Sequence, residues 1–136
     1  MPEFKYEPLF QAGHHEGTTF RHVTREGVQS VDLGGERFLR VDADALRRLA
    51  YEAIGDVSFL LRTKHLEMLA SILTDPEATD NDRFVARELM DNAVIAAERV
   101  FPSCQDTGTA AIMGKRGARV LVDGDENEAL SRGVYE

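Results

Sequence analysis

The chain has 136 residues and a single cysteine, Cys104, so no disulfide can form within it. It has no apolar run close to the roughly 20 residues that cross a bilayer. Its first residues, Met1 to Lys5, lack the basic and then apolar segments that are typical of a secretory signal. These absences favour a reducing compartment. We therefore expect a cytoplasmic protein without a membrane partner.

Clusters of basic residues are also absent. The chain has 16 Lys and Arg against 24 Asp and Glu, which gives a formal net charge of −8. Because nucleic-acid binding depends largely on basic side chains that neutralise phosphates, we expect no nucleic-acid partner. A small anionic ligand would need counter-charges focused at one place, since the overall field of the chain repels it.

The Gly-x-Gly-x-x-Gly motif of dinucleotide-binding sites is missing too, and so is the Cys-x-x-Cys motif of metal and redox sites. Gly108 and the Gly114-Lys115 pair do not form a phosphate loop. Five residues separate the glycines rather than four, and Arg116 stands where Ser or Thr would hold magnesium. These features exclude the common nucleoside-phosphate sites.

Two stretches are typical of strand pairs. Val28 to Val41 has apolar residues on both sides of Gly34-Gly35, a dipeptide that allows the positive φ of a tight turn. A second strand pair is expected from Thr109 to Met113 and from Ala118 to Val122, joined by the residues 114–117. The fold class is therefore predicted to be α+β.

Three amphipathic helices are expected between these strand pairs, with apolar residues spaced three and four apart. The first begins at Asp42 or Asp44, both of which are suitable N-caps. The second starts after Thr63 and is stopped by Asp75-Pro76. The third starts with a sequence that resembles a capping box, Thr79 to Asp82. We expect the three helices to cluster, with their apolar stripes forming the core.

A further helix is expected to start near Glu126, and it has completed only two or three turns when the sequence stops at Glu136. We interpret this as a cut end and expect residues 1–136 to be an incomplete domain without a second domain. An exposed sheet edge and an exposed apolar helix face would then follow.

The stretch from Pro102 to Thr109 holds Cys104 together with an amide, a carboxylate and two hydroxyl groups. The Pro102 ring prevents the preceding helix from continuing, so Cys104 is expected on a short loop. Two interpretations remain open on the residues alone. Cys104 is either an inert cysteine buried in a turn, with Asp106 and Thr107 as turn residues, or a reactive group that a loop presents.

Several segments in their order and spacing, from about residue 20 to the last residue, together carry a family resemblance. They are Phe59 to Arg62, Asp75 to Ala78, Asn81 to Ala86, Asn92-Ala93, Ile95 to Ala97, Pro102 to Ala110, Met113 to Gly117 and Ser131 to Tyr135. The chain resembles the N-terminal part of class I fumarases, which are oxygen-sensitive iron–sulfur hydro-lyases. It also resembles the α subunit of the related tartrate dehydratases.

The resemblance implies a role for three neighbouring residues. Cys104 would be one of three cysteines that hold a [4Fe–4S] cluster, whose fourth iron acts as a Lewis acid on the substrate. Gln105 and Asp106 would contact the substrate, and Asp106 would transfer a proton. The reaction implied is the reversible loss of water from malate to give fumarate.

This chain supplies only one of the three implied cluster ligands, so we expect it to be inactive alone. The expected partners are a small dicarboxylate (malate or fumarate) and the remainder of the enzyme or a partner subunit, with a homodimer as the complete form. Two alternatives stay open. The chain is a truncated, non-catalytic relative that acts as a subunit-interaction module, or it is the α-type part of a tartrate dehydratase.

Overall fold

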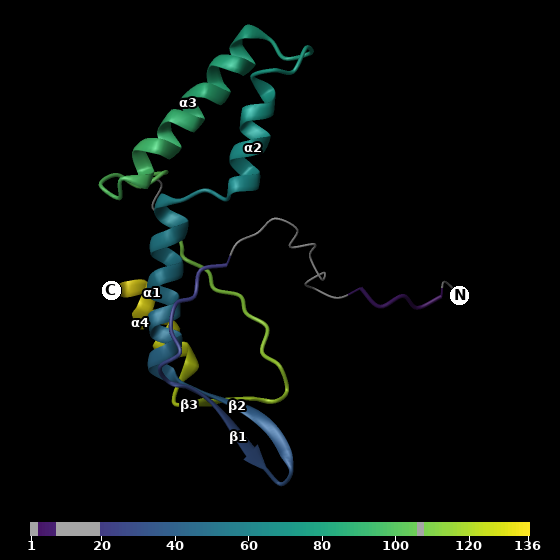
Figure 1. Ribbon diagram of the computed structural model, residues 1–136, viewed down its shortest axis with the longest axis vertical. Helices are drawn as coiled ribbons and strands as arrows, with labels where there is room; N and C mark the ends of the chain where they lie inside the picture. The colour runs from purple at the N-terminus through teal and green to yellow at the C-terminus, as the bar shows by residue number, and fades with distance from the viewer. Residues whose placement is uncertain (1–2, 8–19, 106–107) are drawn as a thin grey trace.

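The computed structural model describes residues 3–7, 20–105 and 108–136, and these form a mixed α+β fold. In chain order the elements are β1 (Val28–Leu33), β2 (Glu36–Asp42), α1 (Ala43–Phe59), α2 (Thr63–Ile72), α3 (Asp80–Ala97), β3 (Val120–Asp123) and α4 (Glu126–Tyr135). The strands lie at one end of the molecule and the α2–α3 pair at the other, with α1 between them (Figure 1). In the part of the chain described here, no helix is both long and apolar enough to cross a membrane.

The predicted first hairpin is confirmed. β1 and β2 pair antiparallel, with Leu33 opposite Glu36 across the turn. Gly34 and Gly35 both have positive φ, at 65° and 84°, which is the backbone geometry that residues with a Cβ adopt with difficulty. The Asp32 carboxylate accepts a hydrogen bond of 3.0 Å from the Gly35 N–H and completes the turn.

The predicted second strand pair does not form, although its second strand is present as β3. β3 pairs parallel with β2, with Val122 opposite Val41, and the residues 108–117 contain no strand. The open edge of β2 already offers β3 a row of backbone partners. Ala110 and Ile112 meanwhile line a cavity of about 350 Å³ together with Leu130 and Val134 of α4, so the segment that should have formed a strand lies against a helix.

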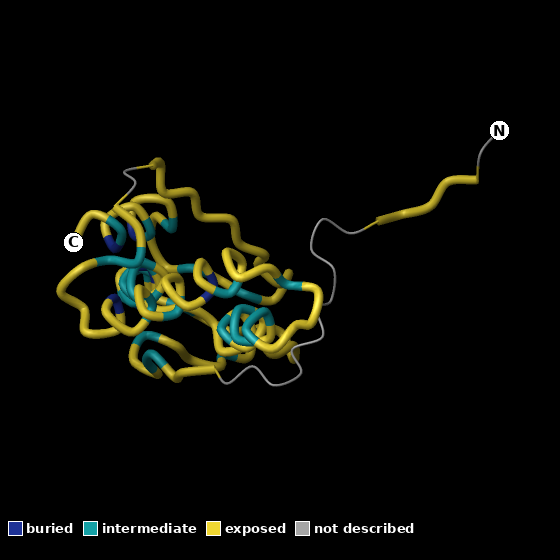
Figure 2. Tube along the Cα trace, turned by 90° about the horizontal axis from the view of Figure 1, so that it is seen from above, coloured by how far each residue is buried: buried dark blue, intermediate teal, exposed yellow. Residues whose placement is uncertain are grey.

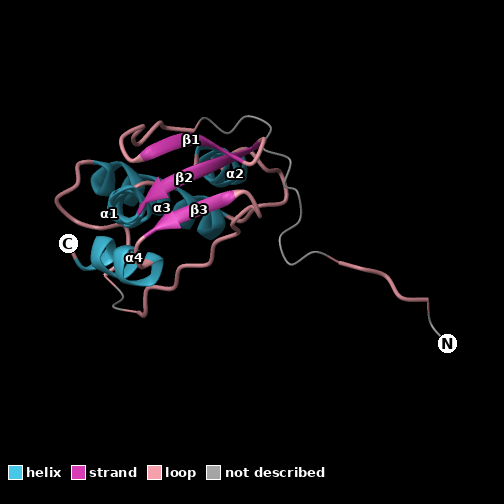
Figure 3. Ribbon diagram, turned by 90° about the horizontal axis from the view of Figure 1, so that it is seen from below, coloured by secondary structure: helices cyan, strands magenta, loops and turns pink. Residues whose placement is uncertain are grey.

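α1 packs against α4, beside the end of the sheet at which β2 and β3 finish (Figure 3). The two helices approach closely because their contacting residues are small: Ala50 on α1, and Ala129 and Gly133 on α4, are all buried. A Cβ added to Gly133 would lie 2.1 Å from the Arg47 carbonyl oxygen and 2.8 Å from the Ala50 Cβ. Glycine at this position therefore sets the distance between the helices.

The three predicted helices are present, but they share no single core: α2 packs on α3, and α1 packs chiefly on α4 and only to a small extent on α3. The predicted helix starts are confirmed to within one residue: α1 starts after Asp42, whose side chain makes no capping bond, and α2 starts at Thr63. The Thr79 hydroxyl accepts from the Asp82 N–H at 3.2 Å, and the Asp82 carboxylate accepts from the Thr79 N–H at 2.8 Å. This reciprocal capping box satisfies two backbone donors at the start of α3. It also lowers the pKa of Asp82, chiefly through the Thr79 hydroxyl.

The apolar stripes do not form the predicted core. Among the described residues, those buried are five alanines and Gly133, and large residues such as Val57 and Leu89 remain 66% and 47% exposed. Most of the described trace is coloured as exposed (Figure 2). The described residues therefore form an incomplete domain, and the predicted exposure of an apolar helix face is confirmed.

Replacing Gly133 with Ala is expected to push α4 away from α1, because the new methyl group overlaps the Arg47 carbonyl. Overpacking of this kind costs about 1–3 kcal/mol of unfolding free energy. Urea unfolding followed by circular dichroism measures this change, and a Gly133→Ala variant as stable as the parent chain would contradict the close crossing.

Gly55→Ala is the matched control within α1. A Cβ at Gly55 meets only the Arg99 guanidinium at 3.8 Å, which is an ordinary contact. Because alanine is the better helix former, this variant is expected to gain about 0.5–1 kcal/mol.

Candidate functional site

Cys104 lies on the turn that follows α3, and both Cys104 and Gln105 are exposed. The alternative interpretation of Cys104 as a buried turn residue is therefore wrong. Asp106, for which a catalytic role is predicted, and its neighbour Thr107 lie outside the described residues. The candidate site is therefore described through Cys104 and the residues just before it in the chain.

Ser103, the residue before Cys104, is bonded to the last turn of α1. Its backbone N–H and its hydroxyl both donate to the Ser58 carbonyl, at 2.8 Å and 3.0 Å. The last four carbonyls of a helix have no partner within that helix, and Ser58 is the penultimate residue of α1. Ser103 therefore caps α1 from a distant part of the chain, and α1 in turn fixes Ser103.

Arg99 turns the chain from α3 back toward α1. It has φ of 61°, the left-handed region that costs a residue with a Cβ free energy. Its guanidinium donates to the Asp56 carboxylate at 2.7 Å and lies 5.9 Å from the Phe59 ring centroid. Both contacts are on the last two turns of α1, so they hold the backbone in this conformation.

Asp56 joins three segments of the chain. Arg21 donates to it at 2.7 Å and to Glu52 at 3.0 Å, while Arg99 donates to its other oxygen. Hydrogen bonds from Arg21 and then Arg99 lower the pKa of Asp56. About a third of the Asp56 side chain is exposed, so solvent screens these pairs and each contributes little alone. Their effect is to orient the segments.

A contact from α3 holds the other side of Ser103. The Asn92 side-chain amide donates to the Ser103 carbonyl at 3.0 Å. The turn from Arg99 to Ser103 is thus fixed at both ends, through Asp56 and Ser58 on α1 and through Asn92 on α3. This arrangement presents the Cys104 side chain to solvent from a defined backbone.

The donor set does not hold a metal by itself. Within residues 3–7, 20–105 and 108–136, no group of three or more His, Cys, Asp or Glu side chains is placed to bind an ion. An iron–sulfur cluster takes several thiolate ligands, and this chain offers one. An exposed thiol on a fixed turn fits the role of a single ligand and does not fit a complete site.

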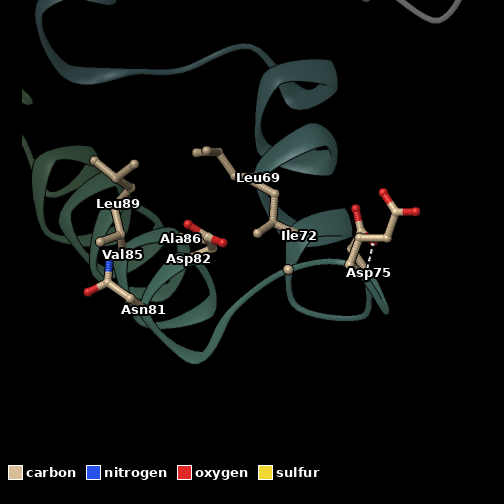
Figure 4. Close-up of a pocket in the computed structure, with 10 residues that line it drawn as sticks. Leu69, Ile72, Asp75, Asn81, Asp82, Val85, Ala86 and Leu89 are labelled. Carbon is tan, nitrogen blue, oxygen red and sulfur yellow. Dashed lines mark hydrogen bonds between the residues drawn. The ribbon is translucent and has the colours of Figure 1, made fainter.

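A cavity of about 530 Å³ between α2 and α3 is lined by residues that do not belong to the Cys104 turn (Figure 4). Leu69, Ile72, Val85 and Leu89 give it apolar walls. Of its three carboxylates, Asp82 belongs to the capping box, Asp75 accepts from the Glu77 N–H at 2.9 Å, and the third is that of Glu77. The cavity therefore adds no reactive group to the Cys104 turn.

The sequence did not identify the residues that fix the turn, namely Ser58, Asn92, Arg99 and Ser103. Pro102 indicated where α3 must end, and the open carbonyls of a helix end indicate that some donor is needed. Neither signal identifies Ser103 as the donor to the Ser58 carbonyl, because the two residues are 45 positions apart in the sequence.

The chain is similar to known proteins over most or all of its length. A family model described as "Fumarate hydratase (Fumerase)" matches residues 47–136. Fumarate hydratase 1, mitochondrial, of Leishmania major is 48% identical over 100% of this chain and 25% of its own length. Fumarate hydratase class I, anaerobic, of Escherichia coli is 46% identical over 97% of this chain and 24% of its own length. The chain thus spans about a quarter of the length of the curated relatives it matches.

The paired arginines are expected to make Asp56 contribute to stability above its ordinary pKa of 3.8. Because the folded-state pKa is lowered, this contribution is present at neutral pH and is lost as the pH falls from 3.8 through the folded-state value. The difference in unfolding free energy between the parent chain and Asp56→Asn should therefore be constant from pH 7 to about pH 4 and shrink below it. Urea unfolding at several pH values measures this, and an equal difference at pH 3 and pH 7 would show that the charge is not involved.

Proposed function

Because the chain belongs to the fumarate hydratase family, we propose that it is the N-terminal segment of a class I fumarate hydratase, a hydro-lyase that interconverts malate with fumarate and water. The match over residues 47–136 and the identity of 46–48% to two fumarate hydratases support this proposal. The names of the relatives favour malate and fumarate over tartrate as the substrate pair.

In this proposal Cys104 is one thiolate ligand of a [4Fe–4S] cluster. The observation that carries the assignment is the fixed backbone at Ser103 beside an exposed Cys104. When bound, such a cluster supplies an iron that polarises the substrate's C–O bond. This chain's own contribution is to hold one ligand of that cluster and to place the two following side chains beside it.

Gln105 and Asp106 carry the proposed contacts to the substrate. The amide of Gln105 can donate to a substrate carboxylate and accept from a hydroxyl. Asp106 transfers a proton, which at neutral pH requires a raised carboxyl pKa, and enclosure in the complete site would provide this. Hydroxide is a poor leaving group, so proton transfer to the departing oxygen is the step for which an adjacent acid is needed.

The remaining ligands and the rest of the substrate site lie outside this chain in the proposed enzyme. The chain spans about a quarter of its relatives' length, and its helices expose apolar faces. We propose that the rest of the protein covers these faces and that the complete enzyme is a homodimer in the cytoplasm. The Leishmania relative is named as mitochondrial, so cell fractionation is the measurement that decides the compartment.

A subunit-interaction module is the second candidate, because exposed large apolar residues are also typical of a surface that binds a partner. The two candidates differ in what Cys104 does. In an interaction module the Cys104 turn matters only for packing, and the assembled protein would not need its thiolate.

Cys104→Ala in the protein expressed from its complete reading frame is expected to remove both the iron–sulfur absorbance and fumarate hydration. The thiolate is lost in this variant, so the cluster loses a ligand. Glu67→Ala, at an exposed polar position on α2, is the control and should leave both unchanged. Full activity of the Cys104→Ala variant would favour the interaction module and reject the cluster assignment.

The 136-residue chain alone is expected to fail in anaerobic reconstitution with iron and sulfide. One thiolate does not hold four irons against loss to solvent. Iron content and fumarate hydration, both measured after gel filtration, test this. A stable four-iron cluster with turnover on this chain would mean that the chain needs no further segment.

A further inference from the structure

The contact between Asn92 and Ser103 has a consequence for Cys104, and the inference rests on the function proposed above. We propose that Asn92 is a positioning residue, which fixes the peptide unit that carries Cys104 and thereby the direction in which the thiolate points. Asn92 lies in α3, five residues before the helix ends at Ala97, and its amide nitrogen is 3.0 Å from the Ser103 carbonyl oxygen.

The geometry of the peptide bond gives this contact its effect. The Ser103 carbonyl and the Cys104 N–H belong to the same planar unit, so a bond that orients the carbonyl also orients the Cys104 Cα. On the preceding peptide unit, the Ser103 N–H is held by the Ser58 carbonyl at 2.8 Å. α1 therefore fixes one side of Ser103, and α3 fixes the other.

The two helices that supply these bonds are themselves connected. Arg99, just after α3, donates to Asp56 of α1 at 2.7 Å. Asn92 and Ser58 are consequently fixed relative to each other before any ligand binds. A ligand sulfur must be held within about 0.5 Å of its working position, and every bond of this frame comes from residues of this chain.

The contact requires a donor, which is why an amide suits this position. The Ser103 carbonyl can only accept, and the Asn92 side chain offers N–H groups. Aspartate has nearly the same shape and no N–H, and its negative charge would repel the carbonyl oxygen. The side chain of Asn92 is exposed, so water replaces the lost bond and global stability should change little.

The test compares Asn92→Asp with Asn81→Asp in the protein expressed from its complete reading frame. Asn81 lies in the first turn of the same helix, so the control makes the same change of charge far from Ser103. The first readout is amide hydrogen exchange of Ser103 in the iron-free protein. The second is the rate at which the reconstituted protein releases iron to a chelator.

Asn92→Asp is expected to raise exchange at Ser103 at least tenfold and to speed iron release at least fivefold. Asn92→Ala, which removes the donor without adding repulsion, should show smaller changes of the same sign, and Asn81→Asp should show neither. Unchanged exchange at Ser103, or an equal rise throughout α3, would overturn the proposal. Faster exchange with unchanged iron release would also overturn it and leave Cys104 as a ligand. Failure of the function proposed above is seen separately, as iron retained by Cys104→Ala.

Discussion

The pair of hydrogen bonds from Ser103 to the Ser58 carbonyl is the constraint on which the Cys104 turn depends. The end of α1 has carbonyl groups without a partner in the helix, and the loop supplies hydrogen-bond donors to one of them. These hydrogen bonds fix Ser103, the residue next to the cysteine. Arg99 makes the return to α1 possible, because its contacts with Asp56 and Phe59 compensate for a left-handed backbone. The site is thus built from the ends of helices rather than from their apolar faces.

The rest of the fold places that helix end. α1 runs from the hairpin to the α2–α3 pair, and α4 packs against it where Gly133 leaves room for the Arg47 carbonyl (Figure 1). Buried alanines and glycine allow close approach, but they contribute little apolar area. Many large apolar residues are exposed, which agrees with a chain that spans about a quarter of its relatives' length. Further protein over those residues is part of the proposed enzyme.

Local signals in the sequence were sufficient for most of the elements. Gly34-Gly35 gave the hairpin, the capping box at Thr79 gave the start of α3, and Pro102 gave the position of the loop. Contacts between residues far apart in the sequence could not be predicted from local signals. The pairing of β3 with β2 depends on which edge is open in space, and the packing of α1 on α4 depends on Gly133 meeting a backbone 86 positions earlier. The family resemblance was visible in the ordered motifs of the sequence. The bonds that fix Ser103 are visible only in the folded structure.

The Cys104 sulfur is proposed to bind iron in the complete protein. Alkylation with iodoacetamide under anaerobic conditions, followed by mass spectrometry of the peptide that contains Cys104, tests this proposal most directly. We expect Cys104 to resist alkylation while iron is bound and to be modified fully once a chelator has removed the iron, because a thiolate engaged in a cluster is not a free nucleophile. Equal modification of Cys104 before and after iron removal would contradict the assignment.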